Sequence, residues 1–291
     1  MIDLHMHSKY STDGCEELSY MLKQAEDLGL KYISITDHNS CLAYKDLKVK
    51  EVRELYSGKI ITGVELNTKV LGIPIEILGY NIESEKLQQL IDEVYLSIDE
   101  RNRIEVERIY KKAIEAGMSL PRDFVLKYDG SIYCSKYFHN YITKDINNKK
   151  FINDNSWNDS NIFYREYMSN PSTKFFVDMD DALPGFEVSS EIVRKAGGMV
   201  FLPHIFEYRE NSERILKYIL ENYKIDGIEC YYRNFSMEQT EYLLSICKEK
   251  GLYVSGGSDY HGRVKPVKMG IGEGKLNVPD DIIEEWKKVL V

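Results

Sequence analysis

Cysteine is scarce in this sequence. Only five cysteines occur among 291 residues, and none lies in a C-x-x-C pair. An odd number without that spacing argues against a disulfide framework and against a zinc knuckle, and it favours a reducing compartment. A basic segment followed by an apolar one is missing from the N-terminal residues, and no run approaches the ~18 apolar residues that a membrane helix needs. We therefore expect a cytoplasmic protein that makes no membrane contact.

Positive charge is also in short supply. The chain has 38 Lys and Arg against 47 Asp and Glu, which gives a formal net charge of −9. This balance argues against a broad surface that follows the phosphates of long duplex nucleic acid. A small anionic substrate would need local help from metal ions or a few arginines. With 43% hydrophobic residues, the chain can form one large α/β domain or one domain with a sizeable insertion.

Histidine is rare too, and its positions are informative. Of the six histidines, five stand where an apolar run gives way to polar residues, namely His5, His7, His38, His204 and His261. Side chains alternate between the two faces of a strand, so His5 and His7 are expected to point the same way. Two imidazoles on one face can take neighbouring positions around one metal ion. For this pair alone, the alternative is two solvent-facing histidines.

Strand-like and helix-like segments alternate over much of the chain. Short apolar runs predict strands at 2–7, 32–36, 60–66, 74–80, 199–203, 226–230 and 253–258. Apolar residues at helical spacing predict helices at 17–28, 187–196, 212–223 and 237–250. This alternation is typical of a parallel α/β sheet or barrel. Helix formers, aromatics and Asn/Asp interrupt it, so we expect a barrel part at 1–83, a largely helical insertion at 84–183 and a second barrel part at 184–291.

The chemistry-bearing residues follow the predicted strands. In α/β barrels the carboxyl ends of the strands converge on one mouth. The candidates leaving strands in that direction are His5, His7, His38, Glu65, Glu76, His204, Asp259 and His261. So many N and O ligands exceed what one catalytic zinc takes from protein, which implies at least two metals, with Glu65 as the bridging carboxylate. Alternatively, Glu65 and Glu76 are buried salt-bridge partners, and Asp37 caps the next helix.

The combined motifs resemble those of the PHP (polymerase and histidinol phosphatase) superfamily of metal-dependent phosphoesterases. They are H-x-H at 5–7, T-D-H at 36–38, G-V-E at 63–65, P-H at 203–204 and G-G-S-D-Y-H-G at 256–262. The resemblance implies a distorted (β/α)7 barrel with two or three divalent metal ions, Mn2+, Fe2+ or Zn2+. The insertion, the 187–198 helix and residues 226–232 look most like one branch. Its members remove phosphate from nucleoside 3′,5′-bisphosphates or trim short oligoribonucleotides from the 5′ end.

The resemblance also implies which residues share each metal. One ion would take His5, His7, Glu65 and Asp259; a second would share Glu65 and use His204; a third would take Asp13, His38 and His261. Two positions depart from the branch. Glu76 stands where the branch usually has a histidine, and glutamate still binds a hard cation. Cys134-Ser135-Lys136 stands where the branch tends to carry an R-x-H pair for substrate phosphate, which leaves the substrate open.

We expect a hydroxide generated by the metals to attack phosphorus in line with the leaving oxygen. His38 and His261 are expected near the leaving group. A third metal or an arginine would stabilise the leaving group better than a metal-bound imidazole does. Arg209, Arg233 and Lys136 are the candidate phosphate contacts. Besides a nucleotide or short RNA, two alternatives stay open. One is a small-metabolite phosphatase such as histidinol phosphatase, and the other is a non-catalytic metal-binding module.

Overall fold

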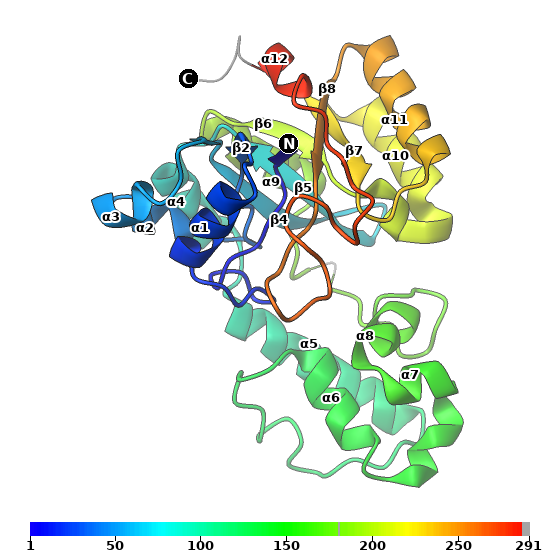
Figure 1. The fold of residues 1–291 in the computed structure, drawn as a ribbon. Coiled ribbons are helices and arrows are strands. Elements are labelled where there is room, and N and C mark those ends of the chain that lie inside the picture. The colour runs from blue at the N-terminus through cyan, green and yellow to red at the C-terminus, as the bar shows by residue number, and fades with distance from the viewer. Residues whose placement is uncertain (180, 287–291) are drawn as a thin grey trace. The chain divides into compact units, whose positions relative to one another are not determined.

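Two compact units make up the chain in this computed structural model, which describes residues 1–179 and 181–286. The first unit comprises Met1–Tyr95 and Pro184–Val291, and the second comprises Leu96–Leu183. The first unit holds all of the strands assigned in the described residues, whereas the second is helical (Figure 1).

Eight strands of the first unit form two sheets. They are β1 (Ile2–Asp3), β2 (Tyr32–Ile33), β3 (Lys59–Ile60), β4 (Gly63–Val70), β5 (Ile73–Tyr80), β6 (Met199–Leu202), β7 (Gly227–Tyr232) and β8 (Tyr253–Gly257). Strands β1, β2 and β3 form a parallel sheet. The second sheet has the order β4-β5-β6-β7-β8.

Backbone pairing joins these two sheets into a barrel. The amide of Leu4 donates to the carbonyl of Gly256 at 3.1 Å, and Met6 pairs with Tyr260, so β1 continues beside β8. On the other side His38 pairs with Glu65, which places the end of β2 beside β4. Only two residues separate β3 from β4, so these two strands occupy one position in the barrel. The described residues therefore form a barrel with seven strand positions. The expected distorted α/β barrel is confirmed.

The distortion comes from β5, which runs antiparallel to both of its neighbours. Leu71 and Gly72, with φ of 55° and 73°, form the two-residue turn between β4 and β5, and positive φ at both positions suits a tight hairpin. The expectation that every strand runs in one direction was therefore wrong here. Glu76 lies early in β5, opposite Asn67, and not at a carboxyl end. It approaches the mouth because its strand is reversed.

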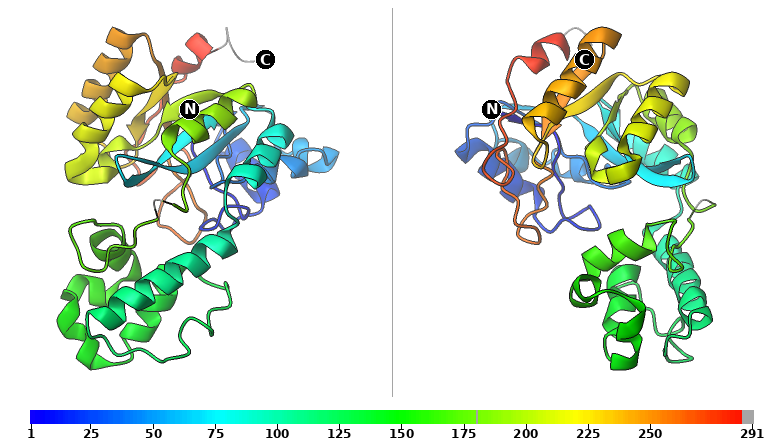
Figure 2. Two further views of the ribbon diagram at one scale, coloured as in Figure 1. Left: turned by 180° about the vertical axis from the view of Figure 1, so that it is seen from behind. Right: turned by 90° about the vertical axis from the view of Figure 1, so that its right-hand side faces the viewer.

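Eight α-helices are assigned in the described residues of the first unit. They are α1 (Leu18–Asp27), α2 (Ala43–Asp46), α3 (Lys50–Arg53), α4 (Ser84–Val94), α9 (Phe186–Lys195), α10 (Ser212–Asn222), α11 (Met237–Lys250) and α12 (Ile282–Trp286). A capping box between Ser236 and Gln239 starts α11, and Gly251 with φ 65° ends it. Helix α11 packs against β7, and α9 against β4 and β6 (Figures 1 and 2).

An apolar plug fills one end of the barrel. Leu4, Tyr80, Phe201 and Trp286 are fully buried there, and burial of each such side chain stabilises the fold by about 1.5–3 kcal/mol. The Tyr80 hydroxyl donates to the carbonyl of Leu4 at 2.9 Å. Leu4 directly follows β1, Tyr80 ends reversed β5, Phe201 lies on β6, and Trp286 ends α12. The polar residues that follow the parallel strands therefore gather at the other edge.

The second unit has its own core. Its elements are α5 (Ile98–Glu115), α6 (Cys134–Ile142), η1 (Ile146–Phe151), α7 (Asp154–Asn158), α8 (Ser160–Phe163) and the π-helix η2 (Tyr164–Met168). Aromatic side chains such as Phe124, Phe138 and Phe163 pack in its centre. The unit starts later than the expected residue 84, because Leu87 and Ile91 of α4 are buried in the core of the first unit. Among the described residues, no helix has the length and apolarity needed to span a membrane.

Candidate metal centre

The structure brings the nine expected ligand residues into one cluster at the polar edge of the barrel. His5 and His7 follow β1, Glu65 lies on β4, and Glu76 lies on β5. The remaining five stand on segments that follow β1, β2, β6 and β8, namely Asp13, His38, His204, Asp259 and His261. His5 and His7 are fully buried, so the alternative of two solvent-facing histidines is wrong.

Glu65 occupies the centre of this cluster. Its Oε1 lies 2.9 Å from Nε2 of His204. Its Oε2 lies 3.2 Å from Nε2 of both His5 and His7, and 3.3 Å from Nδ1 of His38. A carboxylate with one oxygen toward one histidine and the other toward three can bridge two cations. Among the described residues, the ion pairs of Glu65 are all with imidazoles, which does not fit an ordinary lysine or arginine salt bridge.

Asp259 forms a second convergence point. Its Oδ1 lies 3.2 Å from Nε2 of His7, 3.6 Å from Nε2 of His5 and 3.5 Å from Nδ1 of His261. Asp259 has a φ of 55°, and His204 has a φ of 24°. Residues with side chains rarely adopt such backbone angles, at a cost of about 1–3 kcal/mol each. Two ligand positions are therefore held in a strained backbone that the surrounding fold maintains.

A third group of expected ligands, Asp13, His38 and His261, lies beside those around Glu65 and Asp259. Asp13, on the loop that follows His7, has Oδ2 2.9 Å from Nε2 of His261 and Oδ1 3.6 Å from Nε2 of His38. Glu76 is less tightly placed, with Oε2 3.6 Å from Nε2 of His204. The Tyr208 hydroxyl donates to Glu76 Oε2 at 3.3 Å and accepts the backbone N–H of Glu76 at 2.9 Å. Glu76 thus lies within coordinating reach of the cluster, although its partner is a tyrosine.

Unpartnered nitrogen atoms test whether these residues fit a cation. Nε2 of His5, His7 and His261 and Nδ1 of His38 are buried without a hydrogen-bond partner. Leaving such atoms buried and unpaired costs free energy of about 1–3 kcal/mol each. The N-to-O separations of 2.9–3.6 Å are what neighbouring ligands of one ion give when each bond is about 2.0–2.2 Å long. The donor set therefore fits divalent cations.

The charges of the cluster shift the pKa values of its residues in both directions. Burial lowers the pKa of His204, but the Glu65 carboxylate outweighs it and raises this pKa to about 9, and Glu65 likewise raises the pKa of His5. Burial lowers the pKa of His7 to about 4, and the neighbouring His261 adds to this shift, so His7 is neutral at pH 7 and offers a lone pair. Burial alone raises the pKa of Glu65, but the His5 and His38 imidazoles hold it well below its usual range. The same opposition, led by His261, leaves the pKa of Asp259 well below its usual range. Both carboxylates are therefore ionised.

Several buried carboxylates behind the ligands were missed by the sequence reasoning. Asp3, fully buried, accepts the N–H of Ser258 at 2.9 Å and its hydroxyl at 2.6 Å, which fixes the loop before Asp259. Asp37 does the same for the N–H and hydroxyl of Ser8, both at 2.6 Å, instead of capping a helix. In the sequence, Asp3 and Asp37 could have been recognised as acidic residues in or directly after an otherwise apolar run. Glu229 on β7 could have been recognised in the same way.

The three expected phosphate contacts differ in their exposure and in their partners. Nη1 of Arg233 lies 2.8 Å from Oδ2 of Asp259 and donates to its carbonyl at 3.0 Å, and its side chain is only 10% exposed. Arg233 is therefore occupied with a ligand residue. Arg209 is exposed at a backbone kink with φ 51°, and Lys136 is exposed on α6 of the second unit. Lys265, which was not anticipated, has Nζ 2.7 Å from Oδ2 of Asp13 and is 36% exposed.

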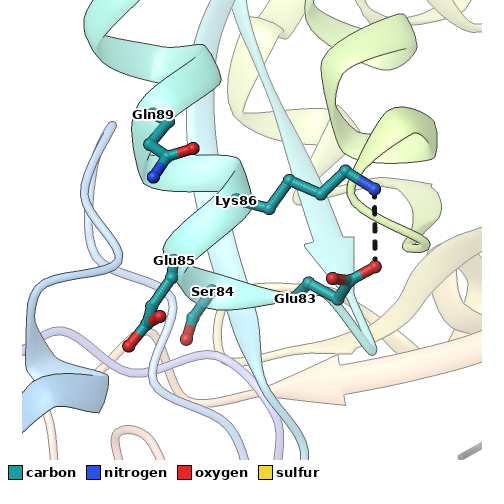
Figure 3. Close-up of a pocket in the computed structure, with 5 residues that line it drawn as sticks. All are labelled: Glu83, Ser84, Glu85, Lys86 and Gln89. Atoms are coloured by element: carbon teal, nitrogen blue, oxygen red, sulfur yellow. Dashed lines mark hydrogen bonds and ion pairs between the residues drawn. The ribbon is translucent and has the colours of Figure 1, made fainter.

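A separate depression lies at the start of α4 and has no ligand residue in its lining. It is formed by Glu83, Ser84, Glu85, Lys86 and Gln89 (Figure 3). The ion pair across it joins Lys86 Nζ to Glu83 Oε1 at 3.5 Å, and both side chains are at least half exposed. An exposed pair of this kind contributes little binding free energy. We assign no site to it.

Known proteins resemble this chain over nearly its whole length. Residues 3–141 match the PHP domain. The "5'-3' exoribonuclease" of Haemophilus influenzae is 24% identical over 298 residues, covering 98% of each chain. The "5'-3' exoribonuclease Rnm" of Escherichia coli is 20% identical over 290 residues, covering 98% of this chain and 92% of that one. A "Probable histidinol-phosphatase" of Thermotoga maritima is 45% identical over 38 residues, 13% of this chain and 16% of that one.

Solved structures share the fold. A protein from Bifidobacterium adolescentis classed as a metal-dependent phosphoesterase superposes with a TM-score of 0.67 at 20% identity, covering 99% of this chain and 96% of that one. An amidohydrolase from Chromobacterium violaceum gives 0.69 at 20% identity, covering 99% and 95%. At this identity the likeness shows the fold alone. Residues 3–141 therefore match a PHP domain, and the fold and the ligand cluster agree with those of PHP-type phosphoesterases.

Proposed function

We propose that this chain hydrolyses phosphate esters of nucleotides, either nucleoside 3′,5′-bisphosphates or short 5′-phosphorylated oligonucleotides. The observation that carries the proposal is the position of Glu65, with four imidazoles within 3.3 Å of its two oxygens. A centre of this kind suits hydrolysis of a phosphoester, because its N and O donors can hold two or more divalent cations that act as Lewis acids. The nucleotide preference is supported by the two near-full-length relatives named exoribonucleases.

Within this proposal, the chain's residues hold two or three divalent cations, Mn2+, Fe2+ or Zn2+. His5, His7, Glu65 and Asp259 would hold one, Glu65 and His204 with Glu76 a second, and Asp13, His38 and His261 a third. When bound, such cations supply Lewis-acid charge and a source of hydroxide near neutral pH. As ligands, His38 and His261 are poor proton donors, so their part in the reaction is to hold charge close to the leaving group.

Side-chain exposure indicates where the substrate enters. His5 and His7 are fully buried, whereas Asp13, Glu76 and His38 are 24%, 27% and 15% exposed. The open side of the cluster is therefore the side of these three residues. Lys265 lies on it, with its ammonium group beside Asp13. We assign Lys265 to the substrate phosphate, because an exposed ammonium group at this edge can contact a phosphate oxygen directly.

The charge distribution supports a small substrate. The second unit, Leu96–Leu183, carries 13 of the 38 basic and 14 of the 47 acidic residues. Nearly all of the net charge of −9 therefore belongs to the barrel unit. A surface of that sign repels long polyanions, while a mononucleotide or short oligonucleotide can be compensated by the cations of the site. The same acidity, with the short histidinol-phosphatase match, keeps a small-metabolite phosphatase as the second candidate.

A substrate panel tests the proposal. The full chain, loaded with Mn2+, is incubated with adenosine 3′,5′-bisphosphate, 5′-phosphorylated oligoribonucleotides of two to five residues, and histidinol phosphate. Release of phosphate or of 5′-mononucleotides from the first two substrates, with little from the third, is the expected result. Preferred hydrolysis of histidinol phosphate would replace the nucleotide proposal. Tight metal binding without product from any substrate would favour the non-catalytic module.

A further inference from the structure

Strand β7 supports the metal centre through hydrogen bonds to its expected ligand residues. None of the grouped ligand residues among those the structure describes lies on β7, yet its side chains contact three ligand residues. Glu229 is fully buried, with Oε1 2.9 Å from Nδ1 of His5, and its Oε2 accepts the backbone N–H of His204 at 2.8 Å. One carboxylate thus joins a ligand that follows β1 to a ligand that follows β6.

A β-bulge explains how β7 reaches ligands on two sides. Glu229 pairs with Ser255, but Tyr231 and Tyr232 pair with Gly256 and Gly257, so Cys230 is one extra residue in the strand. Regular alternation would put Glu229 and Tyr231 on one face and Tyr232 on the other. The extra residue re-aims the side chains that follow it. Tyr232 is consequently buried, and its hydroxyl donates to Oδ2 of Asp259 at 2.9 Å.

The neighbouring strand is built to allow this close approach. A Cβ atom added to Gly257 would lie 2.4 Å from Cβ of His5, and one added to Gly256 would lie 2.6 Å from Cβ of Tyr231. Any side chain at either position would push β8 away from β1 or β7. These glycines therefore let His5, Glu229 and Asp259 lie near one another.

Glu229 also determines which nitrogen of His5 is free. A carboxylate only accepts hydrogen bonds, so the contact at 2.9 Å requires the proton on Nδ1 of His5. Its Nε2 then carries the lone pair, and this atom lies 3.2 Å from Oε2 of Glu65 and 3.6 Å from Oδ1 of Asp259. A hydrogen-bonded carboxylate behind a ligand imidazole fixes its orientation and makes it a better electron donor.

We propose that the bulged strand β7 is the positioning element of the metal centre, with Glu229 fixing His5 and His204, and Tyr232 fixing Asp259. This inference rests on the cation-binding part of the proposed function and not on the identity of the substrate. Its test therefore measures metal binding in the full chain, so that failure of the nucleotide proposal leaves it standing and its own failure leaves the substrate panel unaffected.

The main variant is Glu229→Gln, which keeps the size of the side chain. Its amide can accept from the His204 N–H on one side only, and its NH2 group then faces Nδ1 of His5. That arrangement favours a proton on Nε2, which blocks coordination. We expect Mn2+ and Zn2+ affinity, measured by competition with a fluorescent chelator, to fall about 10–100-fold. The thermal midpoint in EDTA should stay close to that of the unchanged chain.

A matched pair on the same strand supplies the second test. Tyr232→Phe removes the hydroxyl that contacts Asp259 and should weaken cation binding about tenfold. Tyr231→Phe makes the same change one residue away, where no contact with a ligand residue is formed, and should leave affinity unchanged. Unchanged affinity in Glu229→Gln, or equal losses in the two tyrosine variants, would overturn the proposal. If Glu229→Gln does not fold, the tyrosine pair decides.

Discussion

Glu65 Oε1 lies 2.9 Å from Nε2 of His204, although the two residues are 139 positions apart in the chain. The pair joins β4 to the segment after β6, and it connects the two parts of the barrel that the second unit separates in sequence. Because the other oxygen of Glu65 faces three more imidazoles, loss of His204 affects one side of a shared carboxylate.

His204→Ala should therefore abolish phosphoester hydrolysis and reduce the bound metal by about one ion, while the fold stays largely intact. Only one ligand of a many-ligand site is removed, and the barrel core does not depend on it. Metal content by elemental analysis and turnover by phosphate release measure the effect. His139→Ala is the matched control, since His139 contacts the carbonyl of Ser156 within the second unit. Full turnover with unchanged metal content in His204→Ala would refute the assignment.

Glu76 should determine metal preference. Its carboxylate lies 3.6 Å from Nε2 of His204, and carboxylate oxygens favour harder cations such as Mn2+, whereas imidazole favours Zn2+ and Fe2+. Glu76→His should retain metal binding but shift the ratio of affinities toward Zn2+. Glu76→Ala should weaken binding of the second ion. Chelator competition with Mn2+ and Zn2+ measures the ratio, and an unchanged ratio in Glu76→His would place Glu76 outside the coordination shell.

Arg233 should behave as a positioning residue for Asp259. If Arg233 were a phosphate contact, as the sequence analysis expects, Arg233→Ala would raise KM more than it alters metal content. The structure changes this expectation, because Nη1 of Arg233 lies 2.8 Å from Oδ2 of Asp259. A charged hydrogen bond of this kind contributes about 1.5–3 kcal/mol, so Arg233→Ala should weaken cation binding about 10–100-fold. Arg209→Ala, at an exposed position, is the comparison. A change in KM alone would restore the original expectation.

Lys265 should act on the substrate instead. Lys265→Met keeps the length of the side chain and removes its charge, so KM and the inhibition constant of inorganic phosphate should both rise about tenfold, the equivalent of about 1.4 kcal/mol. Metal affinity should stay the same or increase, because Lys265 pairs with Oδ2 of Asp13, the oxygen that also faces His261. Arg233 differs, since it pairs with Oδ2 of Asp259 and leaves Oδ1 toward the histidines. Lys268→Met on the same loop is the control. Lower metal affinity without a change in KM would contradict this role.

Removal of metal should destabilise the barrel unit in particular. A ligand that binds only the folded chain stabilises it by about 2.7 kcal/mol when present at 100 times its dissociation constant. For a unit of this size the corresponding shift is about 5–10 °C. Differential scanning calorimetry with EDTA and with Mn2+ measures it. The second unit contributes no ligand to the cluster, so the midpoint temperature of its unfolding transition should not change. A barrel transition that is insensitive to EDTA would argue against a bound cation.

Local signals were enough for much of the outcome. Helix α11 spans Met237–Lys250, the predicted range, because capping residues and helical spacing act over only a few residues. The strand segments were also visible as apolar runs. Most ligand candidates could be found because they are polar residues in or after such runs, whereas Asp13 was expected only from the resemblance to the PHP superfamily. The sequence alone thus determined the elements, the candidate ligands and the resemblance to the PHP superfamily.

Tertiary structure decided everything that depends on which strands become neighbours. The reversal of β5 comes from its two-residue hairpin with β4. The approach of Glu76 to His204, the pairing of Arg233 with Asp259 and the place of Glu229 behind His5 depend on closure of the barrel. Which distant strands become neighbours is decided by packing between segments far apart in the chain, and the periodicity of one segment does not specify its partner. An acidic residue in a buried strand can be read from the sequence, but its partner is fixed only when the strands meet.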